Sequence, residues 1–208
     1  MRDFSDKLLD LLNNKYGSLN LTRINEAEEF FQKQVLDSML PCDLFESYSA
    51  NIEKGLHLDI GFGGGFPLLP LANRFAETKF LGFEARRKKA DAVRDIAEDL
   101  ALVNIKTFHH RIEDILIDRP CSISFKAVGK ISDYLKKINS NHKVTVYFYK
   151  GPNVKELESV PEKIESFRKI LDEEYELPGT NGRSFIAYEG RSVPRGTKKA
   201  LVKLSELI

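Results

Sequence analysis

The sequence has little of what marks a secreted or a metal-binding protein. Cysteine occurs only twice in 208 residues, as Cys42 and Cys121. A disulfide framework is therefore not expected, and a reducing compartment is. Histidine and cysteine are nowhere clustered at the spacing of a metal site, and the adjacent His109 and His110 would point to opposite faces of a strand. We expect no bound metal ion.

Long apolar runs are also missing. The chain begins Met-Arg-Asp-Phe-Ser-Asp, which lacks the apolar core of a signal peptide, and no apolar run approaches the length of a membrane span. These features predict a cytoplasmic protein with no membrane partner. The net charge of +1 does not by itself indicate a nucleic-acid-binding protein, so such a function must rest on local charge.

The most informative stretch is a glycine turn between two predicted elements. The apolar segment 56–60 predicts a strand, and the glycines that follow it have the spacing G-x-G-x-G, at Gly61, Gly63 and Gly65. The next apolar run, 79–83, ends on Glu84. A carboxylate about 20 residues beyond a glycine turn, at the end of the second strand, is placed to accept hydrogen bonds from ribose hydroxyls. This arrangement predicts a site for a nucleoside-containing cofactor.

The glycine spacing distinguishes between cofactors. A dinucleotide fingerprint, G-x-G-x-x-G, fails because Phe66 stands at its sixth position, and no G-x-x-x-x-G-K-[ST] phosphate loop occurs. A compact G-x-G-x-G with Asp59 two residues before it resembles motif I of S-adenosylmethionine-dependent methyltransferases. The alternative is a turn that only redirects the chain.

The remaining pattern predicts two regions, residues 1–50 and 51–208. The first is a helical extension with one helix at 3–15 and another that Asn25 and Glu28 begin as a capping box and Pro41 ends. In the second, strands alternate with helices, which predicts an α/β, Rossmann-like fold with a seven-stranded, mostly parallel sheet. The predicted strands are 56–60, 79–84, 104–108, 121–126, 143–149 and two antiparallel strands within 171–189; the predicted helices are about 67–76, 86–102, 131–138 and 153–169.

Several motifs, in order along nearly the whole chain, resemble the bacterial ribosomal RNA small-subunit methyltransferase G family. They are Asn20-Leu21-Thr22, Gln34 to Ser38, Asp59 to Ala72, Arg111 to Asp114, Lys126-Ala127, Lys150-Gly151 and Leu177-Pro178. The resemblance implies a class I S-adenosylmethionine-dependent methyltransferase that methylates N7 of a guanine in 16S rRNA, with 16S rRNA or the small ribosomal subunit as its partner. Two residues depart from the family's usual pattern: Gln34 stands in place of His, and Lys126 in place of Arg.

The resemblance also implies roles for individual residues. Gly61, Gly63 and Gly65 would lie under the cofactor and Glu84 would bind its ribose, while Phe66 would wall the pocket or belong to the core. Asp59 would contact the cofactor's amino group, directly or through water, or order the turn. Ile112 and Glu113 would lie beside the adenine, and Lys126 would contact cofactor and substrate unless it is an exposed edge lysine. No catalytic side chain is expected, because guanine N7 carries a lone pair and needs no general base.

Local charge suggests where RNA would bind. Six basic residues between 180 and 203 face a single acid, Glu189, and among them Arg195, Lys198 and Lys199 are the candidate substrate contacts. A second basic cluster runs from Arg86 to Lys89. Solvated surface is the alternative for both clusters. For the protein as a whole, the alternatives are a methyltransferase acting on another RNA, a protein or a small molecule, and a nucleotide-binding module without catalysis.

Overall fold

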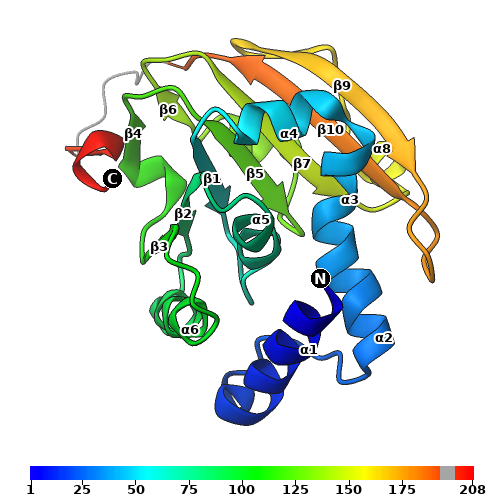
Figure 1. Ribbon diagram of the computed structural model, residues 1–208. Helices are drawn as coiled ribbons and strands as arrows, with labels where there is room; N and C mark the ends of the chain where they lie inside the picture. Colours follow the sequence, from blue (N-terminus) through cyan, green and yellow to red (C-terminus); the bar gives the residue numbers. More distant parts are fainter. Residues whose placement is uncertain (193–199) are drawn as a thin grey trace.

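A mostly parallel, eight-stranded sheet forms the centre of the molecule in the computed structural model, which describes residues 1–192 and 200–208 (Figure 1). Its strand order is β3-β2-β1-β5-β7-β10-β9-β8. Seven longer strands match the predicted seven, and the two-residue β8 extends one edge. The bounds are β1 Leu56–Ile60, β2 Lys79–Phe83, β3 Ile105–Phe108, β5 Ser122–Lys126, β7 Val144–Lys150, β8 Lys163–Ile164, β9 Phe167–Tyr175 and β10 Arg183–Gly190.

The order of strands places a switch point between β1 and β5. β1 pairs in parallel with β2 on one side and with β5 on the other. The chain therefore winds outward in opposite directions from this pair, which leaves a crevice at the carboxyl ends of these strands. Beyond β7, the strands β10 and β9 pair antiparallel. The predicted hairpin is thus part of the main sheet.

Two hydrophobic cores cover the two faces of the sheet. One contains buried side chains of α5 (Leu68–Arg74), α6 (Arg87–Asp99) and the N-terminal helices. The other contains side chains of α7 (Ile131–Leu135) and α8 (Val154–Leu157). α6 illustrates why these segments are helical: its buried residues recur at the spacing of one helix face, at Ala90, Val93, Ile96 and Ala97.

A small second sheet, which the sequence did not predict, lies outside the main one. Its order is β11-β4-β6, with β4 at Ile115–Ile117, β6 at Asn139–Ser140 and β11 at Val202–Lys203. The following 3-10 turn, Leu204–Glu206, is attached because Ser205 donates through its backbone N and its Oγ to the carboxylate of Asp118, at 2.9 and 2.6 Å. The end of the chain is thereby held against β4.

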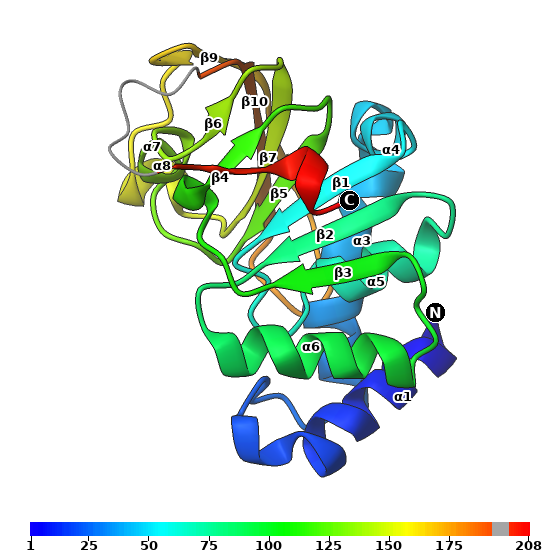
Figure 2. The ribbon, with the colours of Figure 1, turned by 90° about the vertical axis from the view of Figure 1, so that its left-hand side faces the viewer.

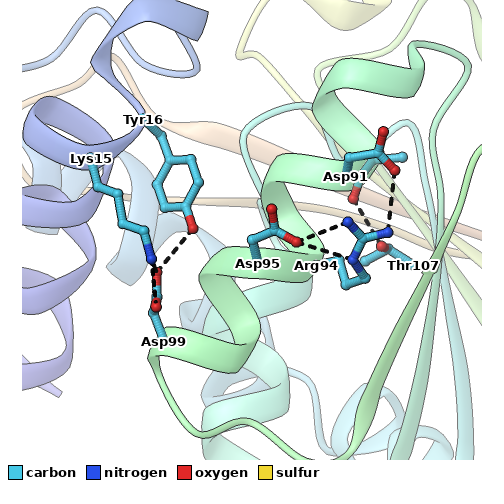
Figure 3. A network of polar contacts seen from close by, with 8 residues as sticks. Lys15, Tyr16, Asp91, Arg94, Asp95, Asp99 and Thr107 are labelled. Carbon is cyan, nitrogen blue, oxygen red and sulfur yellow. Dashed lines mark hydrogen bonds and ion pairs between the residues drawn. The ribbon is translucent and has the colours of Figure 1, made fainter.

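The N-terminal helices form an arm that packs against α5 and α6 (Figures 1 and 2). The elements of the arm are α1 Arg2–Asp10, a π-helical segment Leu11–Lys15, a 3-10 turn Gly17–Leu19, α2 Ala27–Phe30, a second π-helical segment Phe31–Leu36, α3 Asp37–Leu44 and α4 Glu46–Ile52. Lys15 and Tyr16 both donate to the carboxylate of Asp99 at the end of α6, at 2.6 and 2.9 Å (Figure 3). Arm and sheet therefore share one core, and the predicted boundary at residue 50 stays a prediction.

Three local predictions are wrong. The predicted helix at 153–169 is only α8, Val154–Leu157, and the rest consists of a loop, β8, a turn and the start of β9. Pro161 interrupts the helical pattern, and the many charged residues that follow are typical of a strand near a sheet edge. α2 begins after Glu26, without a side-chain cap from Asn25. α3 continues through Pro41 to Leu44, because burial of Pro41 and Cys42 compensates for one lost backbone hydrogen bond.

Within residues 1–192 and 200–208, no helix is long and apolar enough to cross a bilayer.

Apolar packing, rather than the Asp99 contacts, should hold the arm in place. Leu8 is fully buried in the shared core, so we expect Leu8→Ala to lower the free energy of unfolding by about 2–5 kcal/mol. Asp99→Asn should lower it much less, because the Lys15–Asp99 pair is largely exposed. Urea unfolding followed by circular dichroism checks both variants. A separate early transition of the arm in Leu8→Ala would contradict a single shared core.

Candidate cofactor-binding site

A cavity of about 530 Å³ opens at the carboxyl ends of β1, β2 and β5. The turn after β1 is tied to β2, because Gly61 N donates to Phe83 O at 2.7 Å. Seven of the nine predicted cofactor residues line this cavity: Gly61, Gly63, Phe66, Glu84, Ile112, Glu113 and Lys126. The other two, Asp59 and Gly65, lie behind the wall of the cavity. The switch point of the sheet therefore brings together residues that are up to 65 positions apart in the sequence.

Glycine is needed at successive positions of the turn for different structural reasons. Gly63 has a φ of +56°, and a Cβ built on it would meet only the carbonyl oxygen of Gly61, at 4.0 Å, so it would project into open space. At Gly65 a Cβ would collide with the side chain of Leu69. At Gly64 it would lie 2.6 Å from the carbonyl oxygen of Leu21. Gly63 therefore leaves room for a ligand, whereas Gly64 and Gly65 allow close packing behind it.

Glu84 fits the role of ribose acceptor and also shapes the turn. Its carboxylate is nearly buried, accepts from Gly63 N at 3.1 Å through Oε2, and accepts from Arg86 N at 2.9 Å through Oε1. A carboxylate has about four acceptor positions, so these two backbone bonds leave capacity for the two hydroxyls of a ribose. The carboxylate of Glu84 is therefore able to bind the ribose of a nucleoside in the cavity.

Three further predicted residues line the cavity. Ile112 and Glu113 belong to the 3-10 turn Ile112–Asp114, which begins just beyond β3. Phe66 packs edge-to-face on Phe30 of α2, with ring centroids 5.7 Å apart. Both roles considered for Phe66 therefore hold, since its ring lies in the core and also lines the cavity.

Asp59 belongs to a buried polar network inside the sheet. Its Oδ1 accepts from Ser124 Oγ at 3.0 Å, and its Oδ2 has no hydrogen-bond partner in the described part of the chain. The ring nitrogens of His57 lie 2.7 Å from Ser122 Oγ and 2.9 Å from Ser124 Oγ. Burial raises the pKa of Asp59 to about 7 and lowers the pKa of His57 to about 3. At neutral pH the imidazole is therefore uncharged, and burial favours the protonated form of the Asp59 carboxyl group.

Lys126 is not an exposed edge lysine. Its ammonium lies 2.9 Å from Asp37 Oδ2, and Arg183 Nε lies 3.0 Å from the other oxygen of the same carboxylate. Burial lowers the pKa of Lys126, and the charge of Asp37 partly offsets this. The ammonium also lies 5.7 Å from the centroid of the Phe66 ring. Two cations therefore share one buried carboxylate at the edge of the cavity.

Several cavity residues were not predicted as site residues. Leu21 and Gln34 come from the N-terminal arm, and Val128 and Tyr134 follow β5. Arg86 and Lys89, which belong to the basic cluster considered as an RNA contact, also line the cavity. The signal for Leu21 and Gln34 was present, because both belong to motifs that carry the family resemblance. The predicted substrate residues Arg195, Lys198 and Lys199 lie outside the described residues. No group of three or more possible metal ligands occurs in the parts of the chain that the structure covers.

Comparison with known proteins agrees with this geometry. Residues 3–184 match the family model for rRNA small subunit methyltransferase G. The ribosomal RNA small subunit methyltransferase G of Solibacter usitatus (strain Ellin6076) is 32% identical over 190 residues, which cover 86% of this chain and 85% of that protein. The protein of the same name from Syntrophus aciditrophicus (strain SB) is 34% identical over 173 residues, or 76% and 68% of the two chains.

Solved structures show the same fold at low sequence identity. Magnesium protoporphyrin IX methyltransferase from Synechocystis PCC 6803, crystallised with bound S-adenosylmethionine, superposes with a TM-score of 0.57 at 12% identity, over 91% of this chain and 97% of that one. A methyltransferase from Aquifex aeolicus that depends on S-adenosylmethionine gives 0.53 at 16% identity, over 74% and 91%. The chain therefore has the Rossmann-like methyltransferase fold that the sequence predicted.

The His57–Asp59 network predicts a specific pH dependence of stability. Between about pH 4 and 6.5 the folded chain holds a proton on Asp59 that the unfolded chain has lost, and it lacks a proton on His57 that the unfolded chain holds. The two effects cancel in the wild-type protein. In Asp59→Asn only His57 remains, so stability should rise with pH across this window. In His57→Gln only Asp59 remains, so stability should fall as pH rises towards 7.

Urea unfolding of both variants and the wild type at pH 4.5, 5.5 and 6.5 measures these slopes. Each should differ from the wild-type slope by up to about 1.4 kcal/mol per pH unit, with opposite signs. Variants whose slopes equal that of the wild type would show that the two groups titrate at their ordinary pKa values.

Proposed function

Because this chain belongs to the rRNA small subunit methyltransferase G family, we propose that it transfers a methyl group from S-adenosylmethionine to N7 of a guanine in 16S rRNA. The match over residues 3–184 carries this proposal. The cavity supports it, because an acceptor carboxylate, an open glycine turn and a buried ammonium meet at the switch point of the sheet. The chain is accordingly an enzyme that uses S-adenosylmethionine.

The cofactor would lie along the cavity from Ile112 to Lys126. Glu84 would accept from the ribose hydroxyls, and Ile112 and Glu113 would flank the adenine. The methionine part would lie over Gly61 and Gly63, where added Cβ atoms would take up its space. Since Asp59 lies behind the cavity wall, we assign it the ordering of the turn rather than a direct contact with the cofactor.

The reaction requires little from the protein beyond the alignment of guanine N7 with the methyl group. S-adenosylmethionine supplies an activated methyl group, and guanine N7 already carries an in-plane lone pair. Catalysis therefore consists mainly of holding the base in line with the methyl group, which is a positional and entropic contribution. Lys126 would donate a hydrogen bond to guanine O6, which lies beside N7 on the same edge of the base. Its ion pair with Asp37 holds the ammonium at the cavity edge.

A small-molecule substrate fits the rim of the cavity less well. Arg86, Lys89 and Arg111 line the cavity, and their side chains have no carboxylate partner among the described residues. Such a basic rim suits a polyanion. We further propose contacts of Arg195, Lys198 and Lys199 with RNA phosphates, the small ribosomal subunit as the larger partner, and a cytoplasmic location, all of which follow from the family resemblance and the sequence.

The role of Glu84 can be tested by calorimetry. Glu84→Ala should weaken S-adenosylhomocysteine binding by about 1.5–3 kcal/mol, because charge-assisted hydrogen bonds to the ribose are lost. Affinity for methionine, which has no ribose, should change much less. Glu173→Ala, an exposed acid on β9, is the matched control. Equal losses for both ligands would mean that Glu84 acts only by ordering Gly63 and Arg86.

The product can be tested directly on the RNA. Purified protein, S-adenosylmethionine and 16S rRNA or small subunits from a strain without the gene should yield one new 7-methylguanine, located by nuclease digestion and mass spectrometry. Naked rRNA and intact subunits, supplied in parallel, identify the true substrate. Parent and deletion strains with the same 7-methylguanine content would refute the proposal.

A further inference from the structure

A second hollow of about 540 Å³ adjoins the cofactor cavity. We call it the linker groove, because one wall is the segment 19–24, which links the 3-10 turn Gly17–Leu19 to α2; the other wall is Gln34, Arg86 and Lys89. Leu21, Gln34, Arg86 and Lys89 line both hollows, so the two are continuous. Figure 2 shows this part of the arm beside α6, at the edge to which the strands β1 to β3 point.

The linker is in direct contact with the glycine turn. The carbonyl oxygen of Leu21 would lie 2.6 Å from a Cβ on Gly64, so only a glycine allows this approach. The groove therefore reaches the cavity at the turn. Gln34 comes from the neighbouring π-helical segment Phe31–Leu36, directly before Asp37, which holds the ammonium of Lys126. A ligand in the groove would thus lie next to the proposed position of the target base.

The groove carries positive charge that nothing in the described residues neutralises. Arg23, Arg86 and Lys89 line it together with neutral residues, and no aspartate or glutamate does. None of these three cations makes an ion pair or a side-chain hydrogen bond with a described residue. Many other basic side chains do have carboxylate partners: Arg2, Lys15, Lys33, Arg74, Arg94, Lys126, Lys150 and Lys169.

The positive charge of Arg86 and Lys89 at the start of α6 is unfavourable for that helix. The first turn of α6 contains no acidic residue, and positive charge at a helix N-terminus opposes the helix dipole. Arg23 is the only charged residue between Tyr16 and Asn25, in an arm that is acidic as a whole. An anion in the groove would relieve the repulsion among the three cations, as RNA phosphates do.

We propose that the linker groove binds the phosphodiester backbone of the RNA strand beside the target guanine. Arg23 and Lys89 contact the phosphates from opposite walls, with Arg86 between the groove and the cavity, and the guanine enters the cavity past Gln34 and Leu21. This inference rests on the proposed function, and it makes the N-terminal arm part of the substrate site. Because the contacts are to phosphate, they position the strand and do not read its sequence.

The test compares two double variants that remove the same charge. Arg23→Ala/Lys89→Ala alters the groove, and Arg119→Ala/Lys163→Ala removes two exposed cations outside both hollows. Filter binding with transcribed 16S rRNA at several salt concentrations measures affinity, and calorimetry with S-adenosylhomocysteine measures the cofactor site. The groove variant should bind RNA about tenfold or more weakly, with a salt slope shallower by about one to two. Arg23→Ala alone changes a residue that lines the groove and not the cofactor cavity, so its cofactor affinity should stay within about twofold of wild type.

A charge-conserving variant separates phosphate contact from structural damage. Arg23→Lys/Lys89→Arg should keep most of the RNA affinity, because both Arg and Lys bind phosphate and the charge of the groove is unchanged. If the groove variant and the control variant bind RNA equally well, the proposal is overturned. A variant that loses only cofactor binding would also overturn it. The proposed function fails separately: wild-type protein that leaves 16S rRNA unmethylated would refute it, even where RNA binding depends on the groove.

Discussion

The site depends on the close packing of a five-residue glycine turn against segments from distant parts of the chain. Glu84 accepts from Gly63 N on the side of β2, and Leu69 of α5 packs behind Gly65. On the third side, the carbonyl oxygen of Leu21 approaches Gly64 so closely that no side chain fits between them. The turn is therefore held in one conformation with its open side towards the cavity. The same contact brings the N-terminal arm to the edge of the cavity.

Paired and unpaired charges divide the site into two parts with different tasks. Asp37 neutralises part of the charge of Lys126 and Arg183, which come from β5 and β10, so a buried carboxylate fastens the arm to two strands. Such a buried pair is costly to break, because the remaining charge would lack a partner. At the mouth, the cations of the linker groove have no such partner among the described residues. Inside the site, a buried carboxylate thus partly neutralises the positive charges. At the mouth, the cations are free to bind a polyanion.

Much of the fold could be predicted from the sequence. The seven longer strands and α5 and α6 lie within a few residues of the predicted positions, because a parallel sheet buried on both faces leaves short, nearly continuous apolar runs. The segment 153–169 misled prediction because a charged strand near the sheet edge has no apolar run. The glycine turn, Glu84 and Lys126 could be predicted from local signals, because the switch point brings together a glycine turn and the ends of parallel strands. Ile112 and Glu113 were predicted only from the family resemblance.

The sequence alone determined the α/β class, the order of most elements, the glycine turn with Glu84 and the family resemblance. All of these depend on residue types at short, regular spacing. Only the tertiary structure decided that Asp37 binds both Lys126 and Arg183, that Asp59 lies behind the cavity wall, and that residues 19–24 form a groove with the start of α6. Asp37 and Arg183 are 146 positions apart. Contacts at such separations follow from the packing of the whole chain, because no local pattern of residues specifies which distant side chains will meet.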